Sequence, residues 1–183
     1  MAHAAKSLRL FFAVWPDDAA RIRLATVAGE VAAQRGGRAT PAENLHVTVA
    51  FLGTVAADRI DPLGNVASAA RAGIEPFELI LDRVGGAGSQ IAWLAPSTVP
   101  PVLARLHENL VDALAQQGFE ADERRYRPHV TLARRCVRPA RRGGVEPVRW
   151  IVDRFAMVAS TPQAGGSRYD ELAGWSLQST STV

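Results

Sequence analysis

The chain contains very little cysteine and lysine, and it has no long apolar run. Cys136 is the single cysteine among 183 residues, so no disulfide can form within the chain, which fits a reducing compartment. No stretch approaches the roughly 20 apolar residues that cross a membrane. The apolar run at residues 8–15 ends at Pro16 and has no small-residue cleavage site behind it. We therefore expect a cytoplasmic protein without a membrane segment.

Several common catalytic signatures are also missing from the sequence. Residues 85–88 are glycine-rich but lack the lysine of a phosphate-binding loop, so a turn is expected there. No Gly-x-Ser-x-Gly sequence occurs, which disfavours an α/β-hydrolase. The histidines and Cys136 do not have the close spacing of zinc ligands. We therefore predict no metal and no cofactor, a surface position for His107 and an uninvolved thiol at Cys136.

The charge of the chain is small in total but unevenly distributed. With 48% apolar and 21% charged residues, the composition is typical of one globular domain spanning residues 1–183. The net charge is only +3, yet ten arginines and two acids lie between Arg124 and Arg154. This basic segment fits an anionic partner, and it equally fits a solvated loop in a protein that uses arginine for almost all its basic residues.

The tripeptide His-Val-Thr occurs twice and uses two of the four histidines, His46 and His129. Each copy opens an apolar, β-prone run. In a β-strand, side chains two residues apart point to the same face, so each histidine shares a face with its threonine, Thr48 or Thr131. The sequence therefore predicts two strands that each present an imidazole and a hydroxyl.

Hydrophobic periodicity predicts alternating helices and strands, and hence an α+β fold. A strand–helix–strand unit that ends in His-Val-Thr occurs in each half of the chain. We expect one two-lobed domain, with two pseudo-symmetric lobes of antiparallel sheet, helices outside, and the two histidine strands facing each other across a central cleft. The predicted strands are 8–15, 45–52, 77–84, 91–94, 129–134, 149–159 and 168–177, and the predicted helices run from Asp17–Asp18 to Gly36, over 57–72 and over 100–117.

Two imidazoles on opposite sides of a reacting group permit acid–base catalysis near neutral pH. One can accept a proton from a nucleophile while the other donates a proton to a leaving oxygen. Attack and departure on opposite faces are the geometry of displacement at phosphorus. Hydroxyls on the same faces can donate to phosphate oxygens, and an arginine can add a charge-assisted contact. We predict that His46 and His129 are catalytic and that Thr48 and Thr131 bind the substrate.

These motifs make the chain resemble the two-histidine (2H) phosphoesterase superfamily, and most closely its RNA 2′,3′-cyclic phosphodiesterases, also called 2′-5′ RNA ligases. The resemblance implies the bilobal 2H fold and a metal-independent enzyme. It further implies that the enzyme opens 2′,3′-cyclic phosphate ends of RNA or nucleotides to 2′-phosphomonoesters, and that Arg134 helps to hold the substrate. The matching stretches are residues 9–14, 43–53 and 126–134 and, more loosely, 159–160 and 167–169.

Arg134 does not fit simple strand alternation, which points it away from His129 and Thr131. Either the strand ends or bulges near Ala133, or the side chain reaches round the strand's end. The 2′-5′ ligation associated with such proteins would be the same chemistry reversed. It needs no adenylylated lysine, in keeping with Lys6 as the only lysine.

Other interpretations stay open at the level of sequence. His129 is our first choice to activate water and His46 to protonate the 3′ oxygen, but the reverse is nearly as plausible. A non-catalytic RNA-binding module would use the 124–154 arginines on phosphates and Phe11, Phe12 or Tyr169 to stack bases. A 2H phosphodiesterase could instead act on ADP-ribose 1″,2″-cyclic phosphate or another cyclic nucleotide. A monomer is the default expectation for so compact a chain.

Overall fold

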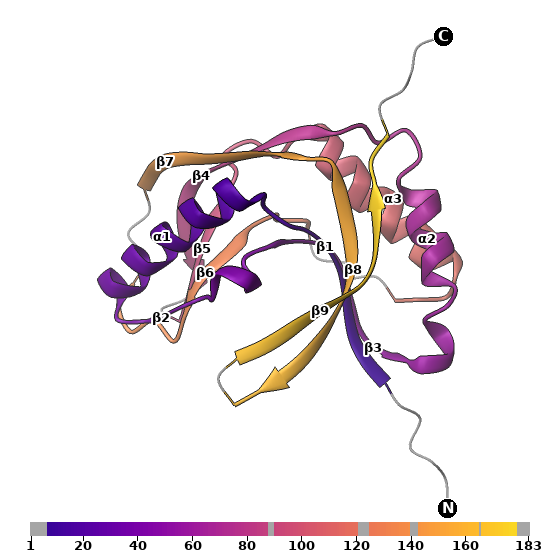
Figure 1. Cartoon of the computed structure of the whole chain (residues 1–183), viewed down its shortest axis with the longest axis horizontal. Helices are drawn as coiled ribbons and strands as arrows, with labels where there is room; N and C mark the ends of the chain where they lie inside the picture. The colour runs from indigo at the N-terminus through magenta and orange to yellow at the C-terminus, as the bar shows by residue number, and fades with distance from the viewer. Residues whose placement is uncertain (1–6, 88–89, 121–124, 140–142, 165, 179–183) are drawn as a thin grey trace, which may run out of the picture.

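One curled antiparallel sheet forms the centre of the protein (Figure 1). The computed structural model describes residues 7–87, 90–120, 125–139, 143–164 and 166–178. Along the sheet the order is β7-β4-β5-β6-β3-β1-β8-β9, and the short β2 pairs with β6. The strands are β1 (Ser7–Val14), β2 (Arg38–Ala39), β3 (Val47–Ala56), β4 (Phe77–Ala87), β5 (Ile91–Ala95), β6 (Val130–Arg134), β7 (Gly143–Val152), β8 (Arg154–Gln163) and β9 (Gly166–Ser176).

The first helix, α1 (Asp18–Arg35), begins and ends as its sequence predicts. The Asp17 side chain accepts a hydrogen bond from the backbone N–H of Ala20 and caps the N-terminus. Gly36 ends the helix with φ 64°, a left-handed conformation that glycine adopts without strain. No described helix is long and apolar enough to cross a membrane.

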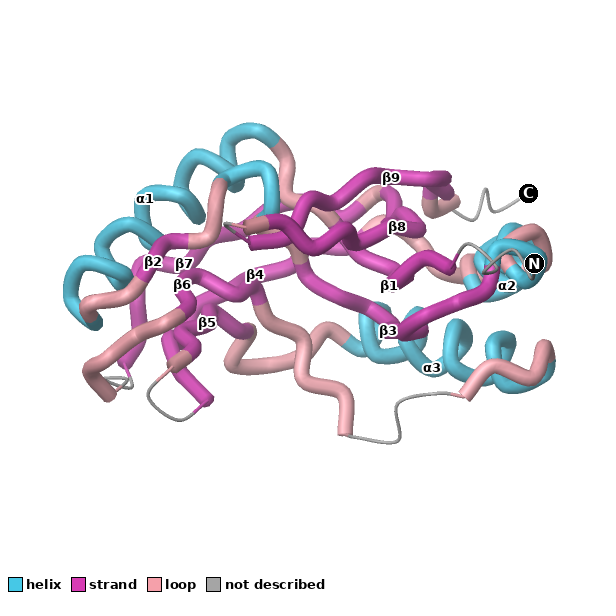
Figure 2. The backbone as a smooth tube through the Cα atoms, turned by 90° about the horizontal axis from the view of Figure 1, so that it is seen from below, coloured by secondary structure: helices cyan, strands magenta, loops and turns pink. Residues whose placement is uncertain are grey.

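The helices are exchanged between the two halves of the sheet. Helix α1 follows β1 in the chain but packs on β6 and β7. Helix α3 (Pro101–Gln116) follows β5 but packs on β3 and on the short α2 (Leu63–Ala70). Figure 2 shows α1 and α3 over opposite ends of the sheet. Since the strand order is symmetric about the β6–β3 pair, the two-lobed α+β architecture is confirmed.

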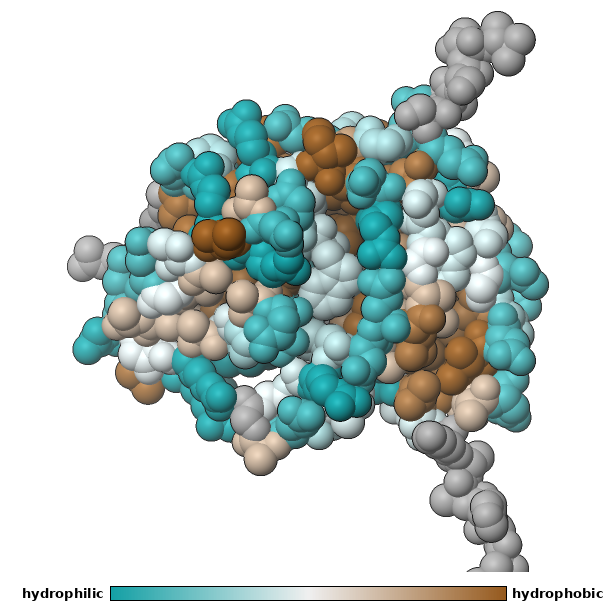
Figure 3. Space-filling model, viewed as in Figure 1, coloured by the Kyte–Doolittle hydropathy of each residue, from teal (hydrophilic) through white to brown (hydrophobic). Residues whose placement is uncertain are grey.

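The core is continuous through both lobes. One buried cluster includes Leu10 and Phe155 from one lobe together with Leu24 and Leu94 from the other. On the outside, hydrophilic residues break the apolar surface of the face in Figure 3 into separate patches. This packing supports a single domain, which stays a prediction.

Some predicted boundaries were wrong. The predicted strand 149–159 is two strands, β7 and β8, which pair with different neighbours on either side of Asp153. An unbroken β-prone stretch gives no signal of that break.

The predicted turn at 85–88 is partly strand, because Gly85 lies in β4 opposite Trp93. A β-carbon at Gly85 would overlap the Trp93 ring, so glycine is needed there for packing.

The second predicted helix, 57–72, is also shorter in the structure. Residues 57–59 form a single 3₁₀ turn, and α2 starts only at Leu63, after Pro62. Proline has no N–H to donate and disfavours helical backbone in the residue before it, so the apolar periodicity of 57–72 overstates the helix.

Candidate active site

The strands of the two His-Val-Thr motifs are direct neighbours at the middle of the sheet. Val47 of β3 is the antiparallel partner of Val130 of β6. In such a pair, the residue before one valine lies across from the residue after the other. The histidine of each motif therefore lies across from the threonine of the other. Both valines are fully buried, so the four polar side chains share the opposite face of the sheet.

A bulge in β6 returns Arg134 to the face of Thr131. Two consecutive residues of β5 pair with residues 131 and 133, which leaves Leu132 as an extra residue. An extra residue shifts the alternation by one position. In agreement, Leu132 and Ala133 are both buried while Arg134 is exposed. Of the explanations considered for Arg134, a bulge near Ala133 is therefore the correct one.

Strand β3 has a bulge at the equivalent place. Val49 is its extra residue against β1, and Val49 and Ala50 are both buried. Phe51 is consequently the counterpart of Arg134, and the guanidinium carbon of Arg9 lies 5.0 Å from the centre of its ring. The strands β3 and β6 thus share the same backbone bulge, but the exposed residue that follows the bulge is Phe51 in β3 and Arg134 in β6.

The His46 ring is fixed by a hydrogen bond and by aromatic neighbours. Its Nδ1 donates to the carbonyl of Asn44 over 2.8 Å, and since a carbonyl only accepts, Nδ1 carries the proton. In the neutral ring Nε2 is then a free base, and it lies 3.2 Å from the Thr48 hydroxyl. Three rings surround the imidazole with centroids 5.0–5.1 Å away, those of Phe11, Trp15 and Tyr169.

This enclosure changes the acidity of His46. Its pKa is lowered to about 4, mainly by burial and also by the positive charges of His129 and Arg134, while the hydrogen bond to Asn44 opposes the shift. His46 is therefore neutral at pH 7. The mutual repulsion also means that His129 and Arg134 lie close enough to His46 to affect its charge.

His129 has the same hydrogen-bonding arrangement in a more open setting. Its Nδ1 donates to the carbonyl of Arg127 over 2.8 Å, so Nε2 again faces outward. The side chain is exposed, and the nearest described ring, Trp93, is tilted with its centroid 6.3 Å away. One histidine is thus enclosed and the other accessible to solvent.

His107 is not simply a surface residue, in contrast to the prediction. It is half-buried, its Nδ1 donates to the Val49 carbonyl over 2.7 Å, and its ring stacks on Tyr126. The Tyr126 hydroxyl donates to the carbonyl of Thr48 over 3.3 Å, and burial raises the pKa of that phenol. Together the two rings satisfy carbonyls of β3 at its bulge, where the ladder is interrupted.

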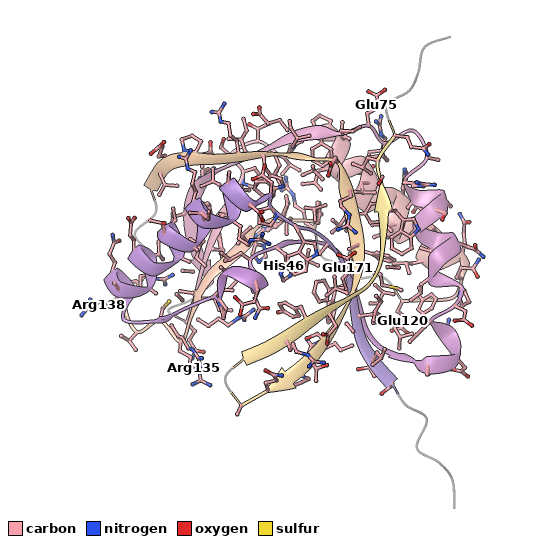
Figure 4. All side chains as sticks on the ribbon, in the orientation of Figure 1. His46, Glu75, Glu120, Arg135, Arg138 and Glu171 are labelled. Carbon is pink, nitrogen blue, oxygen red and sulfur yellow. The ribbon has the colours of Figure 1, made fainter. Side chains whose placement is uncertain are left out.

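Several other residues near the site were not recognised from the sequence as part of it. Asn44 orients His46 and also donates to the Ser167 carbonyl over 2.8 Å, which ties the β8–β9 hairpin to the site. Asn44 lies in the matching stretch 43–53 and Ser167 in the loosely matching stretch 167–169, but nothing in the sequence indicates that these two residues contact each other. Figure 4 shows His46 near the middle of the molecule, and Arg135 and Arg138 toward the end where β2 and β6 lie.

Two aromatic residues suggested for base stacking are unavailable. Phe12 is fully buried and packs on Phe155, and Phe11 is only 4% exposed because it packs on His46. Cys136 is buried as well. Within the described ranges, no three His, Cys, Asp or Glu side chains gather as a metal site would require. Independence from metal stays a prediction.

Comparisons with known proteins agree with one another over most of the chain. Residues 13–162 match the model of the 2′-5′ RNA ligase superfamily. The chain is 33% identical over 177 residues to the RNA 2′,3′-cyclic phosphodiesterase of Escherichia coli K12, covering 92% of this chain and 96% of that protein. It is 30% identical over 187 residues to the protein of the same name from Thermus thermophilus, covering 93% and 91%.

Solved structures show the same similarity. The Escherichia coli protein LigT in complex with 3′-AMP superposes with a TM-score of 0.83 at 30% identity, covering 95% of this chain and all of that one. The structure of the Thermus thermophilus protein TT0787 gives a TM-score of 0.77 at 27% identity over 93% of this chain and 98% of its own.

Proposed function

Because the chain belongs to the 2′-5′ RNA ligase superfamily, we propose that it hydrolyses 2′,3′-cyclic phosphate ends of RNA or nucleotides to 2′-phosphomonoesters. The relatives from Escherichia coli and Thermus thermophilus carry the name RNA 2′,3′-cyclic phosphodiesterase. The observation that carries the proposal is the paired geometry. Two His-x-Thr motifs meet on adjacent strands, with the histidine of each opposite the threonine of the other, and Arg134 on the same face.

In the proposed reaction, His46 is the general base and His129 the general acid. Water loses a proton to Nε2 of His46 as the water oxygen bonds to phosphorus, and the bond from phosphorus to the 3′ oxygen breaks. His129 protonates the departing 3′ oxygen, and the phosphate stays on the 2′ oxygen. The lowered pKa of His46 supports the role of base, since a neutral imidazole can accept a proton at pH 7 whereas an acid must already carry one. This reverses the order favoured from sequence.

Thr48, Thr131 and Arg134 are the proposed substrate-binding residues. Negative charge on the phosphate oxygens grows as water attacks, and hydroxyl and guanidinium donors aimed at those oxygens stabilise it. Thr48 already points its hydroxyl at Nε2 of His46. A phosphate oxygen bound beside that ring would replace Nε2 as the acceptor of the hydrogen bond from the Thr48 hydroxyl. No step needs a metal or cofactor, and the reverse reaction, with a 5′ hydroxyl in place of water, would form a 2′-5′ linkage.

A direct assay tests the proposal. The protein is incubated with adenosine 2′,3′-cyclic phosphate in EDTA and the product is identified as the 2′- or 3′-monophosphate. We expect the 2′-monophosphate, with kcat reduced about 100-fold or more in H46A and in H129A, the usual scale for loss of a general acid or base. No turnover, or turnover that EDTA abolishes, would contradict the proposal. Turnover only of ADP-ribose 1″,2″-cyclic phosphate would keep the chemistry and change the substrate.

A cytoplasmic location and a monomeric state complete the proposal. The lone, buried thiol of Cys136 supports a reducing compartment, and the continuous core supports a protein that needs no partner to fold. Cell fractionation and sedimentation of the purified protein test these two points.

A further inference from the structure

Arg38 and Arg134 lie directly across from each other at the end of the active-site face. Arg38 of β2 is the antiparallel partner of Arg134 of β6, and the next pair is Ala39 with Ala133. Directly opposite residues in an antiparallel pair project to the same side of the sheet. Since the β6 bulge places Arg134 on the side of Thr131, Arg38 projects to that side too.

Two like charges in this position need a reason. Like charges directly opposite one another destabilise a strand pair. Both side chains are exposed, and among the described residues neither has a carboxylate within salt-bridge distance. Other arginines of the chain do form such pairs, as Arg154 does with Glu171 and Arg168 with Asp170. Phosphate groups bound to the two guanidinium groups would offset the repulsion.

The backbone beneath this pair is firmly held. The N–H of Thr40 donates to the Leu132 carbonyl over 2.8 Å and extends the contact between β2 and β6. The side chain of Arg35, only 4% exposed, donates to the carbonyls of Ile91 and Arg138. These contacts join the end of α1 to β5 and to the segment after β6. The backbone that carries the two arginines is therefore held in place, which reduces the ordering that ligand binding would require.

The distances along β6 distinguish the roles of the two arginines. Arg134 is three residues beyond Thr131, about 10 Å along a regular strand, and it lies close enough to lower the pKa of His46. Arg134 thus belongs with the cyclic phosphate at the reaction centre. Arg38 lies across from it on β2, a strand that carries none of the motif residues. An RNA end carries its next phosphate on the 5′ side of the terminal ribose, one nucleotide from the cyclic phosphate.

We propose that Arg38 binds the phosphate on the 5′ side of the terminal nucleotide and so makes the site prefer RNA ends over free nucleoside cyclic phosphates. A guanidinium group suits this role because it is always charged and can contact two phosphate oxygens at once. This subsite rests on the proposed function, since it assumes that a 2′,3′-cyclic phosphate occupies the centre.

The test compares two substrates with the same reacting end. Adenosine 2′,3′-cyclic phosphate has no 5′ phosphate, whereas the dinucleotide ApA ending in a 2′,3′-cyclic phosphate has one. For R38Q we expect KM for the dinucleotide to rise about tenfold, the usual scale of one charged hydrogen-bonding contact, with kcat unchanged and the mononucleotide affected less than twofold. R38K should recover part of the loss. R149Q, which removes an exposed charge from β7, is the matched control and should leave both substrates unchanged.

Binding of products gives a second measurement that needs no turnover. R38Q should weaken binding of the dinucleotide 2′-phosphate about tenfold and leave that of adenosine 2′-phosphate within twofold. Equal losses for both ligands would place Arg38 at the cyclic phosphate and overturn the subsite, as would no loss for either. If wild-type protein turns over neither substrate, the proposed function fails, whereas the binding comparison still decides the role of Arg38.

Discussion

The rings of His107 and Tyr126 stack with their centroids 4.0 Å apart and their planes 7° apart, beside the strand that carries His46. Each ring also donates a hydrogen bond to β3, His107 to the Val49 carbonyl and Tyr126 to the Thr48 carbonyl. A helix residue and a residue from the segment before β6 thus hold the backbone of β3 at the Val49 bulge. Neither ring is in the proposed catalytic machinery, so both would act by position.

Removing the hydrogen bond from His107 should destabilise the protein. H107F keeps an aromatic ring for the stack but leaves the Val49 carbonyl without its donor. We expect a loss of about 1–3 kcal/mol in the free energy of unfolding, the typical penalty for a buried polar group left unsatisfied. Urea denaturation of H107F and wild-type protein measures it. An unchanged midpoint would mean that water satisfies the carbonyl equally well.

The pH dependence of catalysis should distinguish the two histidines. The acidic limb of kcat/KM reports the pKa of the base in the free enzyme. With His46 as base and its pKa lowered to about 4, kcat/KM should show no fall from pH 7 down to about 5 and should fall only near pH 4. An acidic limb close to the ordinary histidine pKa, about 6.5, would exclude His46 as the base.

The same lowered pKa should make folding less favourable in acid. The unfolded chain takes up a proton on His46 below about pH 6.5, whereas the folded protein does so only near pH 4, so stability is lost as pH falls between these values. The loss from this one residue should reach at most about 3 kcal/mol. Urea denaturation at pH 7 and pH 4.5 of wild type and H46Q measures it, and equal losses in the two proteins would refute it.

Arg134 should act on both the substrate and His46. R134Q removes a charge that lowers the pKa of His46, so that pKa should rise, which an NMR titration of the imidazole detects. Loss of the proposed phosphate contact should raise KM for adenosine 2′,3′-cyclic phosphate about tenfold or more. R135Q is a suitable control, because Arg135 is also exposed and directly follows the last residue of β6. An unchanged titration would mean that Arg134 points away from the site.

The protein should unfold as one unit. The buried cluster is continuous between the lobes, so neither lobe has a core of its own. We expect a single calorimetric transition whose van't Hoff and calorimetric enthalpies agree. Two separate transitions would show that the lobes are independent domains.

Much of the site could be predicted because it depends on local pattern. The repeat of His-Val-Thr and two-residue strand periodicity placed each histidine on the same face of its strand as the threonine of its own motif. The pairing of β3 with β6 was not available from the sequence, since register depends on contacts between segments far apart in the chain. Arg134 shares the face of Thr131 because of a bulge, and the sequence offered a bulge near Ala133 as one of several explanations without deciding among them. The low pKa of His46 arises from rings on β1, β9 and the segment after β1, which only the fold assembles.

The break between β7 and β8 and the role of Gly85 illustrate the same limit for the fold. Residues on both sides of Asp153 favour strand, and only their different partners separate them. In the sequence, Gly85 indicates a turn. The structural reason for the glycine is the Trp93 ring of the neighbouring strand, which the sequence does not reveal. Helix α1, in contrast, carries its own cap at each end and was predicted closely.

The exchange of α1 and α3 has a consequence for any protein made from one half alone. Helix α1 covers β6 and β7, and α3 covers β3, so each half supplies the cover for strands of the other. A half-length chain would leave the apolar face of its own strands exposed to water. Two copies could cover these faces by each placing its helix on the strands of the other, the arrangement known as domain swapping. The full-length protein is equivalent to such a swapped dimer joined into one continuous polypeptide.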